Sequence, residues 1–402
     1  LSDLHIGIKL MNRDLSEDQE YLFRQIADYA ASEKPQAVVI AGDIYDRAVP
    51  SGEAVSLFDR FIGMLREAVP EAEIMVISGN HDSGPRINVF RSVLARQHVH
   101  MIGLPPLAPE DYIEKVTLED EFGEVNFYLL PFVRPSMVRR VLMPESVPED
   151  EGYEPLSYDE TLRRLIARED IDPSVRNVLV SHQFYLPAGT SAEDVERADS
   201  EVRTVGNIDE VRTDVLSPFD YAALGHIHKP MKAGSEIYRY CGSPLFTSVS
   251  EAGQKKGIVV VELGAKTSPE AGSATLVRVL PLTPLRDVRI VRGTLEEVLR
   301  EASDDYVSAV LTDETDLDFM DMQDRLHAAF PHLLEIRREN LRIADYTADI
   351  GILPALSAEG GKPNLFSMVN AFLPDLDEEE KKLLKDVINS VGESHASPDG
   401  ES

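Results

Sequence analysis

Histidine, aspartate and asparagine residues gather in five short segments of this chain. They are residues 3–5 (Asp-Leu-His), 42–46 (Gly-Asp-Ile-Tyr-Asp), 79–82 (Gly-Asn-His-Asp), His182, and 225–228 (Gly-His-Ile-His). Each segment lies at the end of an expected strand or directly after one. Open α/β sheets place their active sites at the carboxyl ends of strands. We therefore expect the five segments to meet at one site.

Residue spacing within two of these segments favours such a meeting. In extended backbone, side chains two residues apart point to the same side. Asp3 with His5, and His226 with His228, could then each converge on one site. Glycine suits tight turns in which the backbone leaves a sheet close to a ligand. Glycines at positions 42, 79 and 225 are placed for such turns.

The donor atoms of the five segments suit divalent metal ions. Carboxylate, amide and imidazole groups without thiolate favour Mn²⁺, Fe²⁺ or Zn²⁺ over Ca²⁺, and there are enough of them for two ions. Two ions about 4 Å apart can activate a water, orient it toward a phosphodiester, and stabilise the attacking and leaving oxygens. The sequence therefore predicts a dinuclear site that hydrolyses phosphoesters.

Not every histidine is assigned to this site. His98 and His100 form a second His-x-His pair, and spacing alone would allow either pair to bind a metal. We assign this pair to structure, because the strand expected at 221–224 and the glycine after it place His226 at a strand end. Three further histidines are expected to be ordinary surface or packing residues: His327, His332 and His395.

Alternating strand and helix patterns predict an α/β domain up to about residue 263. Strands are expected at 37–41, 74–77, 125–130, 178–180 and 258–261. A first helix should follow Ser16, where Ser16 and Gln19 could form a capping box. A second helix is expected at 51–67.

The pattern restarts near Pro281 and Pro284. Strands at 288–291, 307–311 and 333–336, with helices at 294–302 and 319–330, predict a small α+β domain. Two amphipathic helical segments follow residue 361. Short helices are marginal alone, so their apolar faces must pack on something, either a partner groove or the body of this protein. The predicted parts are 1–283, 284–350, and 351–402, which ends in a disordered tail.

Composition limits the classes of function. The 402 residues carry a formal charge of −31, which argues against tight autonomous binding of DNA, because lysine and arginine supply most affinity for phosphates. A metal site or a partner protein could supply the missing contacts. No run of about 18 apolar residues predicts a membrane span. Without a signal-like segment, and with Cys241 as the single cysteine, we expect a cytoplasmic protein.

The ordered motifs resemble the calcineurin-like metallophosphoesterase superfamily. Residues 1–7, 41–46, 78–83, 224–228 and 240–244 look further like its SbcD branch of DNA nucleases. This resemblance implies a sandwich of two sheets flanked by helices, with a small α+β capping domain and C-terminal helices. It also implies a metal-dependent double-strand exonuclease and hairpin or single-strand endonuclease that acts in DNA repair and recombination.

The resemblance assigns roles to individual residues. One metal ion would be held by Asp3, His5, Asp43 and His228. The second would be held by Asp43, Asn80, His182 and His226. His81 would stabilise or protonate the leaving oxygen, Asp82 would orient the His81 ring, and Asp46 would contact substrate or support the site.

The resemblance also implies partners. They are DNA, a second copy of the chain in a homodimer, and an SbcC-type coiled-coil ATPase gripped by the C-terminal helices. The expected ions are two Mn²⁺, and the expected location is the nucleoid.

Two other functions remain open from the sequence. Residues 42–47 read Gly-Asp-Ile-Tyr-Asp-Arg, close to the pattern of phosphoprotein or small-molecule phosphatases. Gly-Asn-His-Asp at 79–82, where those phosphatases have glutamate last, argues against them. A non-catalytic scaffold of an ATPase complex is the other alternative, and the intact set of donors argues against it.

Overall fold

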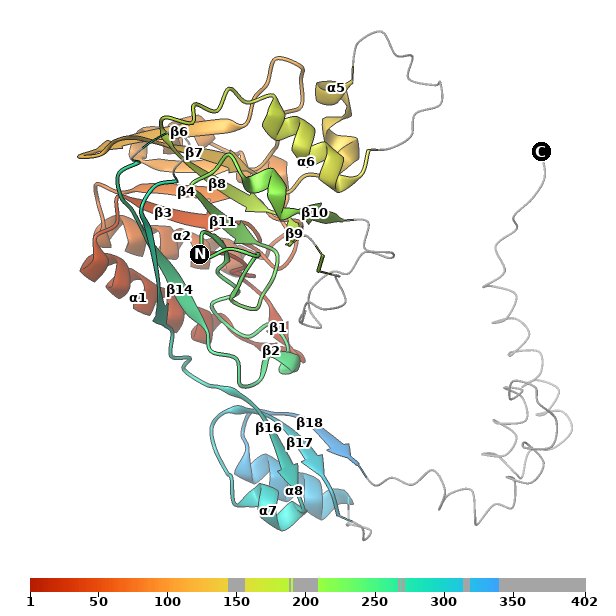
Figure 1. Ribbon diagram of the computed structural model, residues 1–402. Coiled ribbons are helices and arrows are strands. Elements are labelled where there is room, and N and C mark those ends of the chain that lie inside the picture. Colours follow the sequence, from red (N-terminus) through yellow and green to blue (C-terminus); the bar gives the residue numbers. More distant parts are fainter. Residues whose placement is uncertain are drawn as a thin grey trace, which may run out of the picture. The chain divides into compact units, whose positions relative to one another are not determined.

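The computed structural model describes residues 1–143, 156–187, 189–190, 209–266, 268, 272–313 and 319–339 (Figure 1). Two compact units are present, one of Leu1–Val310 with Leu317–Arg337, and one of Leu311–Asp316 with Arg338–Ser402. Nearly all of the second unit lies outside the described residues. The predicted C-terminal helices, the tail and His395 fall there.

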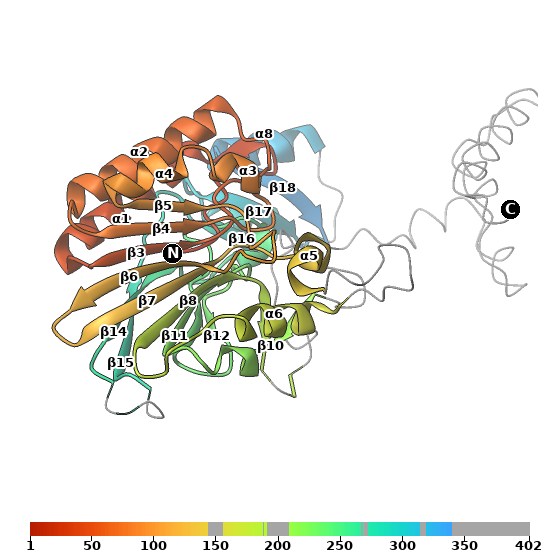
Figure 2. The same ribbon diagram turned by 90° about the horizontal axis from the view of Figure 1, so that it is seen from above.

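One layer of the first unit is a parallel sheet covered by two helices. The strands are β3 (Ala37–Ala41), β4 (Glu73–Ile77) and β5 (Val99–Ile102). The helices α1 (Ser16–Glu33) and α2 (Gly52–Ala68) lie on one side of this sheet, and a second sheet lies on the other (Figure 2). Apolar residues at helical spacing line the buried faces of the two helices. The helices also contact each other, since the rings of Phe23 in α1 and Phe61 in α2 stack at 4.2 Å.

The second sheet has six strands in the order β12-β13-β11-β8-β7-β6. Its inner strands are parallel and its two edge strands antiparallel. The bounds are β6 (Glu114–Asp120), β7 (Gly123–Leu130), β8 (Arg176–His182), β11 (Tyr221–Gly225), β12 (Met231–Lys232) and β13 (Tyr238–Tyr240). Buried residues of β4, β7 and β8 such as Ile77, Leu129 and Val180 pack between the sheets.

Helices cover the outer side of the six-stranded sheet. They are α5 (Arg139–Leu142) and α6 (Tyr158–Ala167), whose buried Leu162 and Leu165 belong to the same apolar cluster as Leu179 of β8. The predicted fold class, two sheets flanked by helices, is therefore confirmed. The five predicted strands are present as β3, β4, β7, β8 and β14.

Smaller elements complete the described chain. They are the hairpin β14 (Gly257–Leu263) with β15 (Thr275–Pro281), the short pairs β1 (Lys9–Leu10) with β2 (Arg13–Asp14) and β9 (Phe184–Leu186) with β10 (Glu210–Arg212), and the helices α3 (Gly84–Ile87) and α4 (Arg91–Leu94). A separate sheet contains β16 (Val288–Gly293), β17 (Tyr306–Leu311) and β18 (Leu333–Arg338), with α7 (Leu295–Leu299) and α8 (Phe319–Ala329). The domain boundaries stay a prediction.

The start of α1 differs from the prediction. Leu15 precedes the helix, and no side chain caps it. Asp14 Oδ1 accepts a hydrogen bond from the Ser16 N–H (2.9 Å), and the Gln19 side chain turns to other partners. The predicted capping box is therefore wrong, because a tertiary contact outcompetes the local one. Among the described residues, we find no helix with the length and apolarity that a bilayer requires.

Candidate metal centre

Four of the five predicted donor segments lie at the carboxyl ends of strands from both sheets, and the prediction of a strand end is wrong for residues 3–5. Asp43 follows β3, Asn80 follows β4, His182 ends β8, and His226 follows β11. The first segment runs beside the loop after β3, since the N–H groups of residues 3, 5 and 6 donate to the carbonyls of residues 42, 43 and 44 at 3.0, 3.0 and 2.9 Å. The five segments therefore meet, as predicted.

The backbone of these segments is not extended. Positive φ angles occur at Asp3 (53°), His5 (42°), Asp43 (48°) and His226 (101°). His226 and His228, the pair after β11, therefore do not point to the same side as extended backbone would have them, and they face different neighbours. His228 Nε2 lies 3.0 Å from His5 Nε2, whereas His226 Nδ1 lies 3.0 Å from Asn80 Oδ1. Such strained backbone persists only where the surrounding structure holds it, and it clusters at functional sites.

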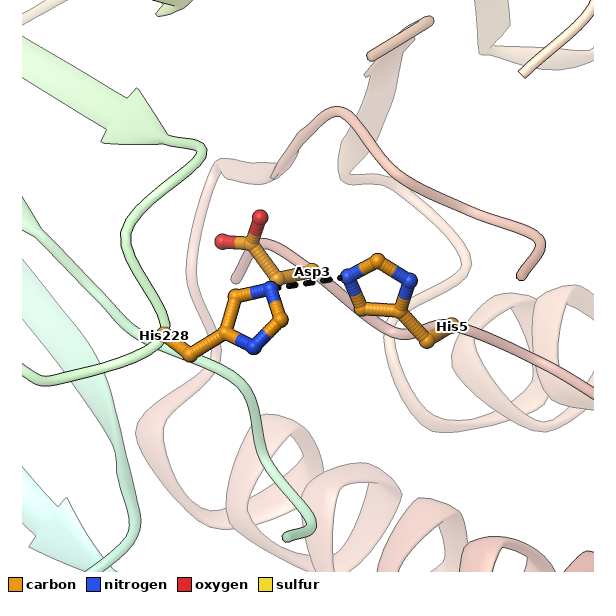
Figure 3. Close-up of side chains that lie close together, drawn as sticks. All are labelled: Asp3, His5 and His228. Atoms are coloured by element: carbon orange, nitrogen blue, oxygen red, sulfur yellow. Dashed lines mark hydrogen bonds between the residues drawn. The ribbon is translucent and has the colours of Figure 1, made fainter. Parts of the chain in front are cut away.

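A first group of donors contains Asp3, His5 and His228, all buried, with ligand atoms within 4.8 Å of one another. Figure 3 shows the His5 and His228 rings meeting through their nitrogens, with the Asp3 carboxylate beside them. Two donors that bind one ion at about 2.1 Å and roughly at right angles lie about 3 Å apart. Asp3 Oδ2 is buried without a hydrogen-bond partner, as a ligand atom would be.

Asp43 lies between this first group and a second group of donors formed by Asn80, His182 and His226. The Asp43 Oδ2 atom is 3.6 Å from His5 Nε2 and 3.3 Å from His182 Nε2. The Asn80 Oδ1 atom is 3.0 Å from His182 Nε2 and 3.0 Å from His226 Nδ1. One carboxylate oxygen thus faces both groups of nitrogens.

Neighbouring groups turn the correct ring nitrogens of two histidines toward the centre. His182 Nδ1 lies 2.8 Å from the Ala41 carbonyl, which can only accept, so this nitrogen carries a hydrogen and Nε2 is the ring nitrogen that faces the centre. His228 Nδ1 lies 2.8 Å from Thr247 Oγ1. Metal-binding histidines ordinarily have such a partner on the other nitrogen.

The electrostatics of the centre favour a cation. Burial alone would raise the pKa of the Asp43 carboxyl, but the imidazoles of His182 and His5 hold it well below its ordinary value. Burial lowers the pKa of His5 well below its ordinary value. Burial would lower the pKa of His182 as well, yet the Asp43 carboxylate raises it to about 9. The buried carboxylates therefore draw positive charge toward them.

Comparison with known proteins gives the same class of site. Residues 1–230 match the calcineurin-like phosphoesterase family. The chain belongs to this family. It is 30% identical over 300 residues to a nuclease SbcCD subunit of Staphylococcus epidermidis, and the match covers 75% of this chain and 73% of that relative. Residues 284–356 match the type 5 capsule protein repressor C-terminal domain.

A similar solved structure is a crystal structure of a Thermus thermophilus protein. It is 10% identical, with a TM-score of 0.31, and the match covers 56% of this chain and 85% of that one. Calcineurin-like phosphoesterases use divalent metal ions, and the buried oxygen and nitrogen donors around Asp43 fit such ions.

His81 lies at the edge of the donors in this calcineurin-like phosphoesterase. The main-chain N–H of His81 donates to Asp43 Oδ1 (2.9 Å). Its ring packs edge to face on the His5 ring, with 4.9 Å between the ring centres. His81 Nδ1 lies 2.9 Å from the main-chain carbonyl of Asp46. This carbonyl, and not the Asp82 carboxylate, therefore orients the His81 ring.

Asp82 bonds main-chain groups of the two loops and not the His81 ring. Its carboxylate accepts hydrogen bonds from the N–H groups of Gly79 (2.9 Å), Ile44 (3.0 Å) and Tyr45 (2.9 Å). The predicted role in orienting His81 is wrong. Asp82 instead ties the loop after β3 to the loop after β4.

Two glycines allow the loops to approach so closely. A Cβ atom at Gly79 would lie 2.1 Å from Asp43 Oδ1 and 2.4 Å from the Asp43 nitrogen. At Gly42, where φ is 86°, it would lie 2.3 Å from His182 Nδ1. Both contacts are too short for real atoms, so the predicted need for glycine at these turns is confirmed.

Sequence reasoning missed the residues behind His228. Glu251 accepts hydrogen bonds from Thr247 and from Lys256, and Lys256 Nζ donates to the His228 carbonyl (3.3 Å). Glu251 and Lys256 are 0% and 4% exposed. The signal in the sequence was the Cys-Gly-Ser-Pro segment at 241–244, since Ser243 Oγ accepts from Lys256 at 2.9 Å.

The second His-x-His pair lies outside the centre, as predicted. His98 Nδ1 and His100 Nε2 lie 2.7 Å from the two carboxylate oxygens of Glu73. His327 is exposed, and His332 packs on the ring of Tyr306 at 5.2 Å.

Proposed function

We propose that this chain is a metal-dependent DNA nuclease with a dinuclear centre. Asp3, His5, Asp43 and His228 would hold the first ion, and Asp43, Asn80, His182 and His226 the second. The observation that carries this proposal is the position of Asp43 Oδ2, which faces nitrogens of both groups at 3.6 and 3.3 Å. Mn²⁺ is the ion we propose for both positions, because oxygen and imidazole donors without thiolate admit it and the resemblance to SbcD-type nucleases implies it.

The bound ions would activate a water and neutralise the charge of the phosphodiester. The chain's own contribution begins with His81. Because the Asp46 carbonyl can only accept, His81 Nδ1 carries a hydrogen, and the ring holds a fixed orientation. When the ring is protonated, Nε2 can donate its proton to the leaving oxygen. Asp82 keeps the loops of Asp43 and Asn80 together during this step.

The choice of DNA as substrate rests on family relatives and on the site. The Staphylococcus relative is called a nuclease and a subunit of SbcCD. We extend that activity to this chain, in DNA repair and recombination in the cytoplasm at the nucleoid. An SbcC-type ATPase would supply the phosphate contacts that a chain of charge −31 lacks.

We further propose a homodimer, attachment of the ATPase through the C-terminal helices, and the division into 1–283, 284–350 and 351–402. The phosphatase alternative gains no support. Arg47, the residue that suggested it, has a side chain 82% exposed and paired with Asp46 at 3.3 Å.

A cleavage assay tests this function. Wild type with Mn²⁺ is expected to cut a labelled DNA hairpin, whereas Asp43→Ala and His81→Ala lose cleavage. A phosphopeptide serves as the control substrate. Turnover of the phosphopeptide without DNA cleavage, in the presence of the partner ATPase and ATP, would contradict the nuclease proposal while keeping the metal centre.

A further inference from the structure

Gln19 of α1 holds the backbone of the first donor segment. Its Nε2 donates to the carbonyls of Leu4 (3.1 Å) and His5 (3.0 Å), and its Oε1 accepts from the N–H of Gly7 (3.2 Å). Both donor hydrogens and the acceptor of the amide are used, and the side chain is only 2% exposed. The two carbonyls fix the orientation of the amide, since neither can face its oxygen.

The segment that Gln19 holds is strained. Residues 3 and 5 have φ of 53° and 42°, which their β-carbons disfavour. On one side, N–H groups of this segment donate to the loop after β3. On the other side, the carbonyls of Leu4 and His5 point to Gln19. The segment is therefore held between the loop after β3 and α1.

The beginning of α1 is itself anchored next to Gln19. Asp18 is 1% exposed, and its Oδ2 accepts from Arg286 Nη1 (3.1 Å) and from the Tyr306 hydroxyl (2.8 Å). A buried carboxylate with two such donors resists displacement. Gln19 thus extends from a fixed point of the fold to the donor segment.

We propose that Gln19 is a positioning residue for the first metal ion. This inference rests on the dinuclear site proposed above. Gln19 acts through the carbonyls of His5, a donor of the first group, and of Leu4, which lies between the donors Asp3 and His5. Asn80, His182 and His226 come from segments to which Gln19 makes none of these bonds. Loss of Gln19 should therefore weaken the binding of the first ion and leave the binding of the second ion unchanged.

The test is titration of the metal-stripped full chain with Mn²⁺. Calorimetry measures the affinity for each ion, and electron paramagnetic resonance counts the bound ions. In Gln19→Met, the affinity for one of the two ions is expected to fall about 10- to 100-fold, which is the range for residues that orient metal ligands. Gln25→Met is the matched control. Gln25, on the same helix, clamps Thr283 through Nε2 (2.6 Å) and Oε1 (3.1 Å), and its loss should leave both affinities unchanged.

A second variant guards against misfolding. Gln19→Glu keeps the shape and the acceptor for Gly7 but removes both donors, so the same selective loss is expected. Unchanged binding of both ions in a folded Gln19 variant would overturn the inference. Equal weakening of both ions would also overturn it, because Gln19 would then be a general structural residue. Failure of wild type to bind two ions would instead contradict the dinuclear site itself.

Discussion

The buried pair of Glu251 and Lys256 should make a large contribution to stability that depends on the presence of both partners. Glu251 is 0% exposed and Lys256 4% exposed, and they form an ion pair. Removing one partner of a buried ion pair costs about 3–5 kcal/mol, because a charge stays buried without compensation. Replacing both by uncharged residues of similar size is often close to neutral.

The pKa of Glu251 gives a second estimate of how much this residue contributes to the free energy of unfolding. Burial alone would raise it, but interactions with His228 and Lys256 lower it from 4.5 to about 2. This shift corresponds to about 3 kcal/mol of stability at neutral pH. Because the folded-state pKa is depressed, the contribution is fully present above pH 4.5 and is lost as the pH falls toward 2. Roughly 2 kcal/mol should be lost by pH 3.

The assay is urea unfolding of the full chain in EDTA, at pH 7 and pH 3. Lys256→Met should lose about 3–5 kcal/mol at pH 7, and Glu251→Gln with Lys256→Met should recover most of it. The double variant should also lose roughly 2 kcal/mol less than wild type on acidification. If the single and double variants were equally destabilised at pH 7, the pair would contribute no coupling energy and the reasoning would be refuted.

Three further predictions concern the centre and its supports. Gly79→Ala should abolish metal binding in calorimetry, because its Cβ would lie 2.1 Å from Asp43 Oδ1, whereas Gly52→Ala, with open space around it, should bind normally. Thr247→Val removes the partner of His228 Nδ1 and should weaken one bound Mn²⁺ about 10- to 100-fold; equal affinities would contradict this role. Tyr306→Phe leaves the buried Asp18 without one donor and should cost about 1–3 kcal/mol in urea unfolding. Tyr29→Phe, which loses an exposed bond to the Pro281 carbonyl, is its control.

The location of the centre could be predicted because it depends on strand ends and residue types. Runs of apolar residues in the sequence predict four of the strands well, namely β3, β4, β8 and β11. The carboxyl ends of these strands bring together Asp43, Asn80, His182 and His226. The internal arrangement could not be predicted by the same means. Period-two spacing assumes extended backbone, whereas His226 has a φ of 101° and faces Asn80, away from the neighbours of His228.

Residues that position the donors were missed for a related reason. Gln19 and Asp82 act on main-chain N–H and carbonyl groups, and any residue type carries those groups, so no side-chain pattern marks the partner. Gln19 fits a capping box equally well in sequence, and only the carbonyls of Leu4 and His5 decide the competition. Ligand identity is thus encoded locally, while ligand geometry depends on distant side chains bonded to backbone. Variants of Gln19 and Thr247 should therefore change metal affinity as strongly as many substitutions within the donor loops.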